Sequence, residues 1–63
     1  LKGAKLVGTT LVNADLFRAN LIGADLSGAN LTGARLLRAI LRDTIMDGTI
    51  LTGAFMPDGS RGD

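Results

Sequence analysis

The residue types that carry most enzyme chemistry are missing from this chain. It has no His, Cys, Tyr, Trp, Glu or Gln, and its only serines are Ser27 and Ser60. General acid–base and nucleophilic catalysis depend on such side chains, and without Cys no thiolate metal site can form. Asp43 and Asp47 lie four residues apart, but no Asp-x-Asp series accompanies them, so a Ca²⁺ site is not indicated. The sequence predicts no enzyme, no catalytic or metal-binding residue and no cofactor.

The charged residues are nearly balanced over the 63-residue chain. Seven Lys and Arg stand against six Asp, which leaves a formal net charge of +1. Arg18, Arg35, Arg38 and Arg42 are basic, but Phe17 is their one aromatic neighbour and acidic residues are interspersed. We interpret these arginines as a solvated surface, because a nucleic-acid site needs a stronger positive field. No apolar run approaches the length of about 20 residues that spans a membrane.

A large aliphatic residue recurs at every fifth position of the chain. The series has no gap and consists of Leu1, Leu6, Leu11, Leu16, Leu21, Leu26, Leu31, Leu36, Leu41, Met46, Leu51 and Met56. We call this position i. A small Ala or Thr stands at i−2, and Gly is the commonest residue at i+2. Such a short, unbroken period indicates a repeat architecture.

The period of five excludes the two regular secondary structures. Five helical residues advance about 500°, so the aliphatic series would scatter around a helix instead of forming a stripe. In a straight strand an odd spacing sends successive residues to opposite faces. The period therefore predicts a corner in every repeat, at i+2, where Gly, Asn and Asp tolerate unusual dihedral angles. Positions i−2 and i then point inward, while i−1 and i+1 point outward.

The repeats resemble a known family. Four consecutive units match its A-(D/N)-L-x-x pattern: Ala14-Asp15-Leu16, Ala19-Asn20-Leu21, Ala24-Asp25-Leu26 and Ala29-Asn30-Leu31. This is the unit of the pentapeptide repeat family. The resemblance implies an all-β fold, a right-handed quadrilateral parallel β-helix with four pentapeptides per coil and about three coils in this chain. Many relatives have no assigned activity, and they are abundant in cyanobacteria and plastid lumens.

The end of the register divides the chain into two parts. Residues 1–57 are predicted to form the β-helix, and residues 58–63 a C-terminal turn and tail, because Pro57-Asp58-Gly59 is a strong turn signal. A coil of four repeats would stack opposite charges in three pairs, Lys5–Asp25, Asp15–Arg35 and Arg38–Asp58. It would also place Arg18 under Arg38, which is unfavourable.

Outward apolar residues gather near the C-terminus. Polar residues at i−1 give way to Ile40, Ile45, Ile50 and Phe55, and the outward residues Phe17, Leu37 and Pro57 share one column. Exposed apolar residues in such number favour a contact surface. The predicted interaction surface is Phe17, Leu37, Ile40, Ile45, Ile50 and Phe55. Two alternatives stay open: a longer chain or the folded-back tail covers the isoleucines, and the column merely stiffens the stack.

We expect a non-enzymatic scaffold or protein-interaction module. A rigid tube without catalytic side chains displays flat faces on which partners can bind. The expected partner is protein, either a second copy or an adjoining segment of a longer chain, with no nucleic acid and no membrane span. The alternative, a DNA gyrase regulator that mimics DNA as some members of the family do, is disfavoured by the near-neutral charge. The residues are compatible with the cytoplasm and with a lumenal or periplasmic compartment.

Overall fold

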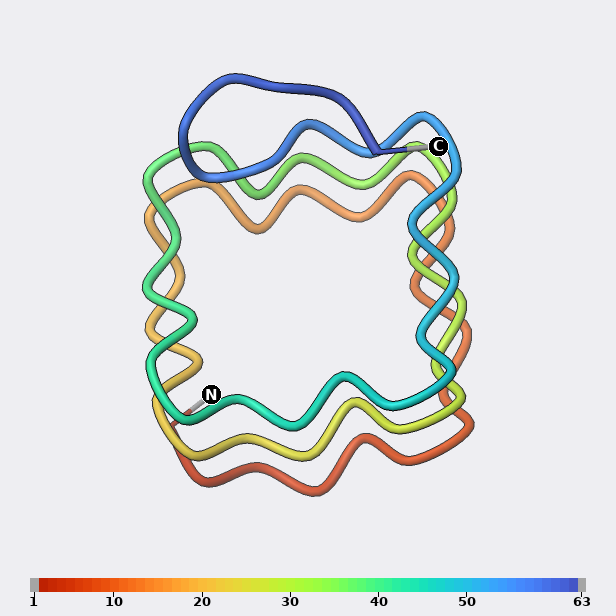
Figure 1. The fold of residues 1–63 in the computed structure, drawn as a ribbon, viewed down its shortest axis with the longest axis vertical. Helices are drawn as coiled ribbons and strands as arrows, with labels where there is room; N and C mark the ends of the chain where they lie inside the picture. The colour runs from red at the N-terminus through yellow and green to blue at the C-terminus, as the bar shows by residue number, and fades with distance from the viewer. Residues whose placement is uncertain (1, 63) are drawn as a thin grey trace.

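The chain winds into a tube of square outline (Figure 1). The structure is a computed structural model that describes residues 2–62. Leu1 and Asp63, the first member of the aliphatic series and the last residue of the expected tail, lie outside this range. The tube is compact, with extents of 23 × 20 × 16 Å. Its successive turns lie one above another, so that residues distant in the sequence become neighbours.

Parallel backbone bridges join residues that are twenty apart. They are Lys5↔Asp25, Thr10↔Asn30, Asp15↔Arg35, Asn20↔Ile40, Asp25↔Ile45, Asn30↔Ile50 and Arg35↔Phe55. A spacing of twenty holds four five-residue repeats, as the family resemblance implied, and it stacks Lys5 beneath Asp25. We call residues 2–20 the N-terminal layer, residues 21–40 the middle layer and residues 41–57 the C-terminal layer.

The repeats of the N-terminal and middle layers, from Leu6 to Leu36, make the same hydrogen bonds. In the Leu6 repeat, the amides of Leu6 and Gly8 donate to the carbonyls of Asp25 and Ser27 at 2.8 and 2.9 Å. The Thr9 amide closes the corner by donating to the Leu6 carbonyl at 3.1 Å. Positions i+1 and i+2 of each repeat lie in this corner. Of the remaining three positions, only i−1 forms a bridge to the next layer. Residues 2–62 therefore form a parallel β-helix of single-residue bridges, with neither a helix nor a continuous strand.

The corners lie where the repeat predicted them. In the three layers, every described i+2 residue before Asp58 has a positive φ, and most are glycines near +68°. Four are not glycine: Asn13, Arg18, Arg38 and Asp43 have φ between 58° and 61°. A turn with positive φ at its third residue is of type II geometry, and Gly or Asn suits it best. The arginines are the exception, because L-residues without a short polar side chain rarely adopt this conformation.

The core lies inside the middle layer. Leu21, Leu26, Leu31 and Leu36 are 0% exposed, and Ala24, Ala29 and Ala34 beside them are also fully buried. The corresponding aliphatic residues of the two other layers are partly buried and pack against this core. Two threonines at i−2 of the C-terminal layer add polar links, since the Thr44 and Thr49 hydroxyls donate to the carbonyls of Leu21 and Leu26. The inward assignment of i−2 and i is confirmed.

The tail folds back onto the C-terminal layer. Its turn forms at the expected residues, since the Gly59 amide donates to the Met56 carbonyl at 2.9 Å. Arg61 then forms an antiparallel bridge with Phe55, and the Gly62 amide donates to the Ala54 carbonyl at 2.7 Å. Figure 1 shows this segment, in dark blue, along one side of the square only. The other sides of this end keep no strand above them within residues 2–62.

Candidate interaction surface

Four apolar side chains, from four successive repeats, encircle the tube near its C-terminal end. We call Ile40, Ile45, Ile50 and Phe55 the apolar belt; they keep 44%, 46%, 45% and 39% of their surface exposed. All four are bridging residues at i−1, so their side chains point outward as predicted. The residues directly beneath them, twenty positions earlier, are the polar Asn20, Asp25, Asn30 and Arg35. The outward bridging positions thus change abruptly from polar to apolar within one turn of the tube.

The belt residues also lack a hydrogen bond that four polar residues at i−1 make. The carboxylate or amide oxygen of Asp15, Asn20, Asp25 and Asn30, all at i−1, accepts a hydrogen bond from the backbone amide two residues later, at 3.0 to 3.2 Å. Such Asx turns support the corner locally. Ile and Phe cannot accept this bond. The sequence analysis missed this role of the Asp or Asn at i−1. The signal was present, because an Asp or Asn two residues before a turn position is typical of an Asx turn.

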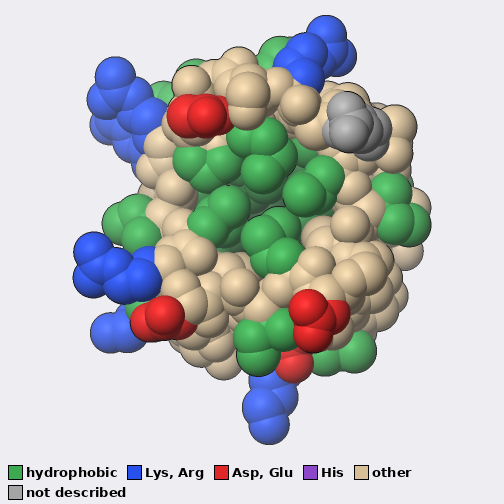
Figure 2. Space-filling view, viewed as in Figure 1, with side chains coloured by type: hydrophobic (Ala, Val, Ile, Leu, Met, Phe, Trp, Pro, Cys, Tyr) green, Lys and Arg blue, Asp and Glu red, His purple; other side chains and the backbone are tan. Residues whose placement is uncertain are grey.

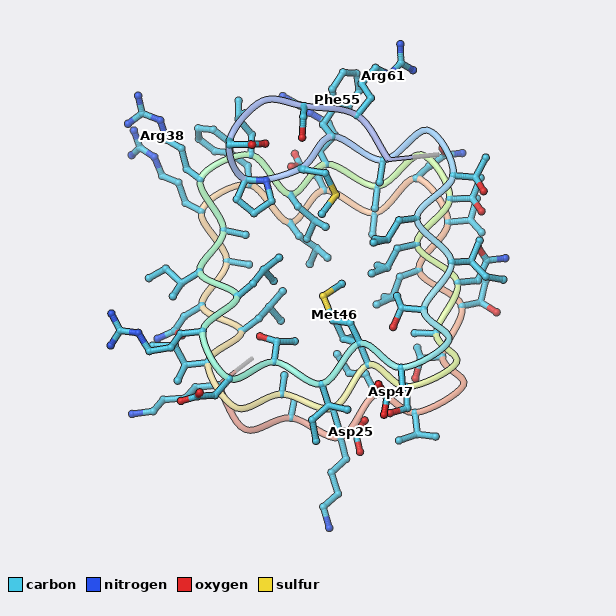
Figure 3. All side chains as sticks on the ribbon, viewed as in Figure 1. Asp25, Arg38, Met46, Asp47, Phe55 and Arg61 are labelled. Atoms are coloured by element: carbon cyan, nitrogen blue, oxygen red, sulfur yellow. The ribbon has the colours of Figure 1, made fainter. Side chains whose placement is uncertain are left out.

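The tail covers little of the belt. The Arg61 guanidinium lies over the Phe55 ring at 4.9 Å from its centroid (Figure 3). Within residues 2–62 no segment buries Ile40, Ile45 or Ile50. Of the alternatives open for these residues, cover by the folded-back tail is therefore wrong for the three isoleucines. The tail lies on the side of Phe55, because the chain turns back immediately after that repeat.

A second apolar group forms a column on the side that carries the tail. The Arg18 amide donates to the Leu37 carbonyl at 2.9 Å and the Arg38 amide to the Pro57 carbonyl at 3.2 Å, so Phe17, Leu37 and Pro57 lie in successive layers. Phe17 is 43% exposed, and Leu37 and Pro57 are half-buried. The structure therefore brings together the column that the sequence predicted, with Phe55 in the neighbouring column of the same side.

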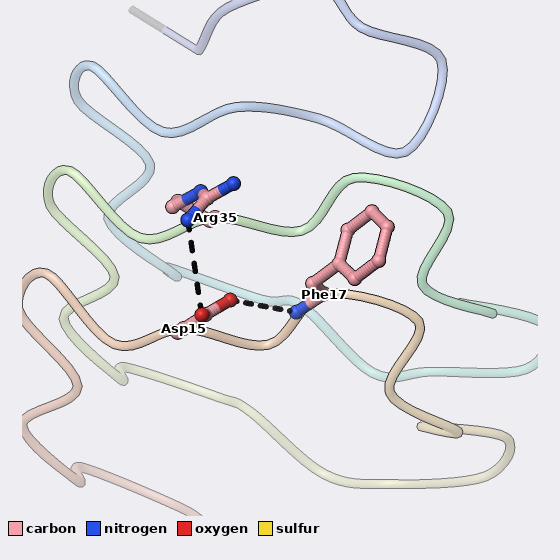
Figure 4. A network of polar contacts seen from close by, with 3 residues as sticks. All are labelled: Asp15, Phe17 and Arg35. Carbon is pink, nitrogen blue, oxygen red and sulfur yellow. Dashed lines mark hydrogen bonds and ion pairs between the residues drawn. The ribbon is translucent and has the colours of Figure 1, made fainter.

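The charged neighbours of this column pair only in part. Arg35 Nη1 lies 3.7 Å from Asp15 Oδ2, and Asp15 Oδ1 also accepts the Phe17 amide at 3.2 Å (Figure 4). Both charged side chains are more than half exposed, so this expected pair contributes little to stability. The backbones of Lys5 and Asp25 are stacked as predicted, although their charged groups do not come within ion-pair distance. Hydrogen bonds from Ser27 lower the pKa of Asp25, and the Lys5 charge adds a smaller effect in the same direction.

The expected ion pair between Arg38 and Asp58 does not form. The Asp58 carboxylate instead accepts hydrogen bonds from the Ser60 amide and hydroxyl at 3.0 and 2.7 Å. These two bonds hold the pKa of Asp58 below its usual value, so the group stays ionised. The reason is a shift of register: Gly59, with φ +91°, takes the positive φ that Asp58 would have had. The unfavourable stack of Arg18 under Arg38 is present.

The described residues form no enclosed site. Residues 2–62 surround no pocket, and no group of three or more potential metal ligands occurs among them. In the same range no helix is long and apolar enough to cross a lipid bilayer. The molecule presents flat sides and two ends, and Figure 2 shows hydrophobic side chains at the centre of the C-terminal end.

Comparison with known proteins identifies the repeat. The model of the family of pentapeptide repeats matches in eight copies, over residues 1–33 and 19–56. The chain belongs to the pentapeptide repeat family. The matched repeats end at residue 56, so the tail lies beyond them. No curated protein matches the chain.

One solved structure similar to this pentapeptide repeat chain is a cyanobacterial protein. It is HetL from Nostoc sp. strain PCC 7120, described as a pentapeptide repeat protein involved in heterocyst differentiation regulation. The two are 34% identical, with a TM-score of 0.36. The match covers 98% of this chain and 40% of HetL, so the chain spans less than half the length of that protein.

Proposed function

We propose that this pentapeptide repeat chain is a non-enzymatic scaffold or protein-interaction module. Its contact surface consists of the apolar belt together with Phe17 and Leu37. The observation that carries this proposal is the belt, in which every member keeps about two-fifths or more of its surface in water. Neither the packing of the core nor the hydrogen bonding of the repeat requires apolar residues at these positions.

The energetics of the belt favour a covering partner. Burial of apolar surface contributes roughly 25 cal/mol per Å², and a ring of Ile and Phe offers this gain on every side of the tube. The repeat gives up the Asx hydrogen bond at each of these positions to present an apolar side chain instead. Four large apolar side chains exposed in one ring, one on each side of a small domain, favour an interaction surface.

The proposed occupant is protein, either a second copy of the chain or an adjoining segment of a longer one. Either occupant would remove belt side chains from water. A regulatory role, as in the description of HetL, would act through such an interaction. The alternative of DNA mimicry gains no support, because seven cations balance six anions over the chain. The proposal includes the finer fold expected above, a right-handed helix of about three coils.

Sedimentation across a concentration series tests self-association. The key variant replaces the belt isoleucines by Thr, as Ile40→Thr, Ile45→Thr and Ile50→Thr, which keeps the β-branched shape. The matched control is Val7→Thr, Val12→Thr and Ile22→Thr, which alters three outward aliphatic residues elsewhere. The wild type and the control should associate as concentration rises, while the belt variant should remain monomeric.

Hydroxyl-radical footprinting tests the adjoining-segment alternative. The reactivity of Ile40, Ile45 and Ile50 is compared between the 63-residue chain and the full-length protein. If the adjoining chain covers the belt, these residues become protected in the full-length protein while Val7 stays reactive. A belt that remains equally reactive in both proteins, together with a wild type that is monomeric at every concentration, would show the proposal to be wrong.

A further inference from the structure

One corner of the tube differs from the other corners. Arg18 and Arg38 occupy it in successive layers, each with φ +61°. At the other corners the described residues with positive φ are Gly3, Gly8, Asn13, Gly23, Gly28, Gly33, Asp43, Gly48 and Gly53. This is the one corner in residues 2–62 where two long charged side chains stand one above another. Figure 3 shows Arg38 extending from this corner away from the tube.

The two arginines are unfavourable for the fold. Arg rarely adopts a positive φ, which Gly reaches without strain. Like charges in adjacent positions of a ladder repel each other. Within the described residues neither guanidinium lies within ion-pair distance of a carboxylate, because Asp15 pairs with Arg35 and Asp58 binds Ser60. The structural role of the corner would be better served by Gly at both positions.

The corner is arranged as a repeated apolar–Arg unit. Phe17 precedes Arg18, and Leu37 precedes Arg38 one layer above. The Arg18 guanidinium lies over the Phe17 ring, 5.1 Å from its centroid. This cation–π contact restrains the guanidinium, although the Arg18 side chain remains exposed. Two exposed guanidiniums thus stand beside two apolar side chains.

We propose that this corner docks an acidic segment of a partner protein. The proposal rests on the interaction function proposed above and names the chemistry of the partner. Aspartate or glutamate side chains of the partner bind the forks of Arg18 and Arg38, since guanidinium matches carboxylate geometry with two parallel hydrogen bonds. Apolar side chains of the same segment pack on Phe17 and Leu37. Nucleic acid fits less well, because Asp15 and Asp58 lie on the same side of the tube as this corner and the net charge is only +1.

Fluorescence anisotropy with synthetic peptides tests the proposal. The probe is a labelled peptide in which Asp alternates with Leu. One matched peptide replaces every Asp by Asn, and another replaces every Leu by Ser. The protein variant is Arg18→Gly with Arg38→Gly, which suits the positive φ and should fold at least as well as the wild type, as a thermal melt verifies. The control Lys2→Gln with Lys5→Gln removes the same two charges away from the corner.

We expect peptide binding to weaken only when the corner arginines are replaced. The arginine variant should bind the Asp/Leu peptide about tenfold or more weakly than the wild type, and the lysine control should change by less than about twofold. Both matched peptides should bind the wild type more weakly, and binding should fall as salt is raised. Equal losses in the two variants, or no wild-type binding at the highest soluble peptide concentration, would overturn the proposal. Self-association through the belt would be unaffected by that outcome, so the two proposals fail separately.

Discussion

The middle layer and the C-terminal layer have the same repeat but different environments. At the inward positions, Leu31 is fully buried, whereas Leu51 in the same column is only partly buried. At the bridging positions, the polar Asn30 lies beneath the exposed Ile50. In a stacked repeat, each unit buries its side chains only by contact with the layers above and below. The comparison teaches that burial here depends on neighbours rather than on the sequence of the unit.

The backbone shows the same difference. In the middle layer, the Leu26 and Leu31 amides donate to carbonyls of the C-terminal layer at 2.7 Å. In the C-terminal layer, the Met56 amide finds the Ser60 carbonyl of the tail at 2.7 Å, but the Met46 and Leu51 amides have no such acceptor in residues 2–62. The tail therefore closes one side of this end. Open strand edges are where further chain pairs.

The largest expected effect separates the buried layer from an outer one. Leu26→Ala should lower the free energy of unfolding by about 2–5 kcal/mol, because layers on both sides prevent collapse around the cavity. Leu6→Ala, in the same column of the N-terminal layer, should cost about half as much or less, since Leu6 is only partly buried. Urea titration measures both. Thr32→Ala, at an outward position, is the control and should cost about 0.5 kcal/mol or less; equal losses at the two leucines would contradict the comparison.

The tail offers a way to make the C-terminal layer more open. A Cβ at Gly62 would collide with the Leu51 carbonyl oxygen, so Gly62→Ala should displace the tail. We expect a loss of about 1–2 kcal/mol and faster hydrogen exchange at the Met56 amide, which donates to Ser60. Arg61→Ala is the control, because it removes the contact with Phe55 and keeps the backbone pairing. If both variants exchange equally fast at Met56, the backbone of the tail does not protect this side.

Two corner substitutions in the middle layer should have opposite signs. Gly28→Ala should destabilise by about 1 kcal/mol, because its φ of +68° is unfavourable for Ala although the space around it is open. Arg38→Gly should stabilise by about 1 kcal/mol, since it relieves the same strain at φ +61° and removes repulsion from Arg18. Thermal melts at matched buffer conditions give both values. A loss of stability in Arg38→Gly would mean that this side chain supports the fold.

The smallest effect concerns pH. The Ser27 hydroxyl and backbone amide lower the pKa of Asp25 in the middle layer, and Ser60 does the same for Asp58 in the tail. A carboxylate whose folded pKa is lowered stabilises the fold above its unfolded pKa of 3.8, and this stabilisation is lost as pH falls through the folded pKa. Ser27→Ala should therefore raise the pKa of Asp25 toward 3.8 in an NMR titration. The pKa of Asp58 serves as the internal control and should not move.

Most of the candidate surface follows from counting along the repeat. The outward positions of Phe17, Leu37 and the apolar belt, and the bridge of Lys5 with Asp25, are consequences of the period and were predicted correctly. The pairing of Arg38 with Asp58 was predicted by the same counting and is wrong. Counting holds only while the register does, and after Pro57 the positive φ moves from Asp58 to Gly59 while the Asp58 carboxylate accepts hydrogen bonds from Ser60.

The sequence by itself determined the period, the corners and the inward series, because each repeat carries the local residues that its own turn requires. A positive φ at Gly23 and an Asx turn at Asp25 depend on no distant contact. Only the tertiary structure decided how deeply each leucine is buried and which side of the C-terminal end is closed. Those properties arise from layers twenty residues apart and from the path of the tail after Pro57, so they depend on contacts that no single repeat contains.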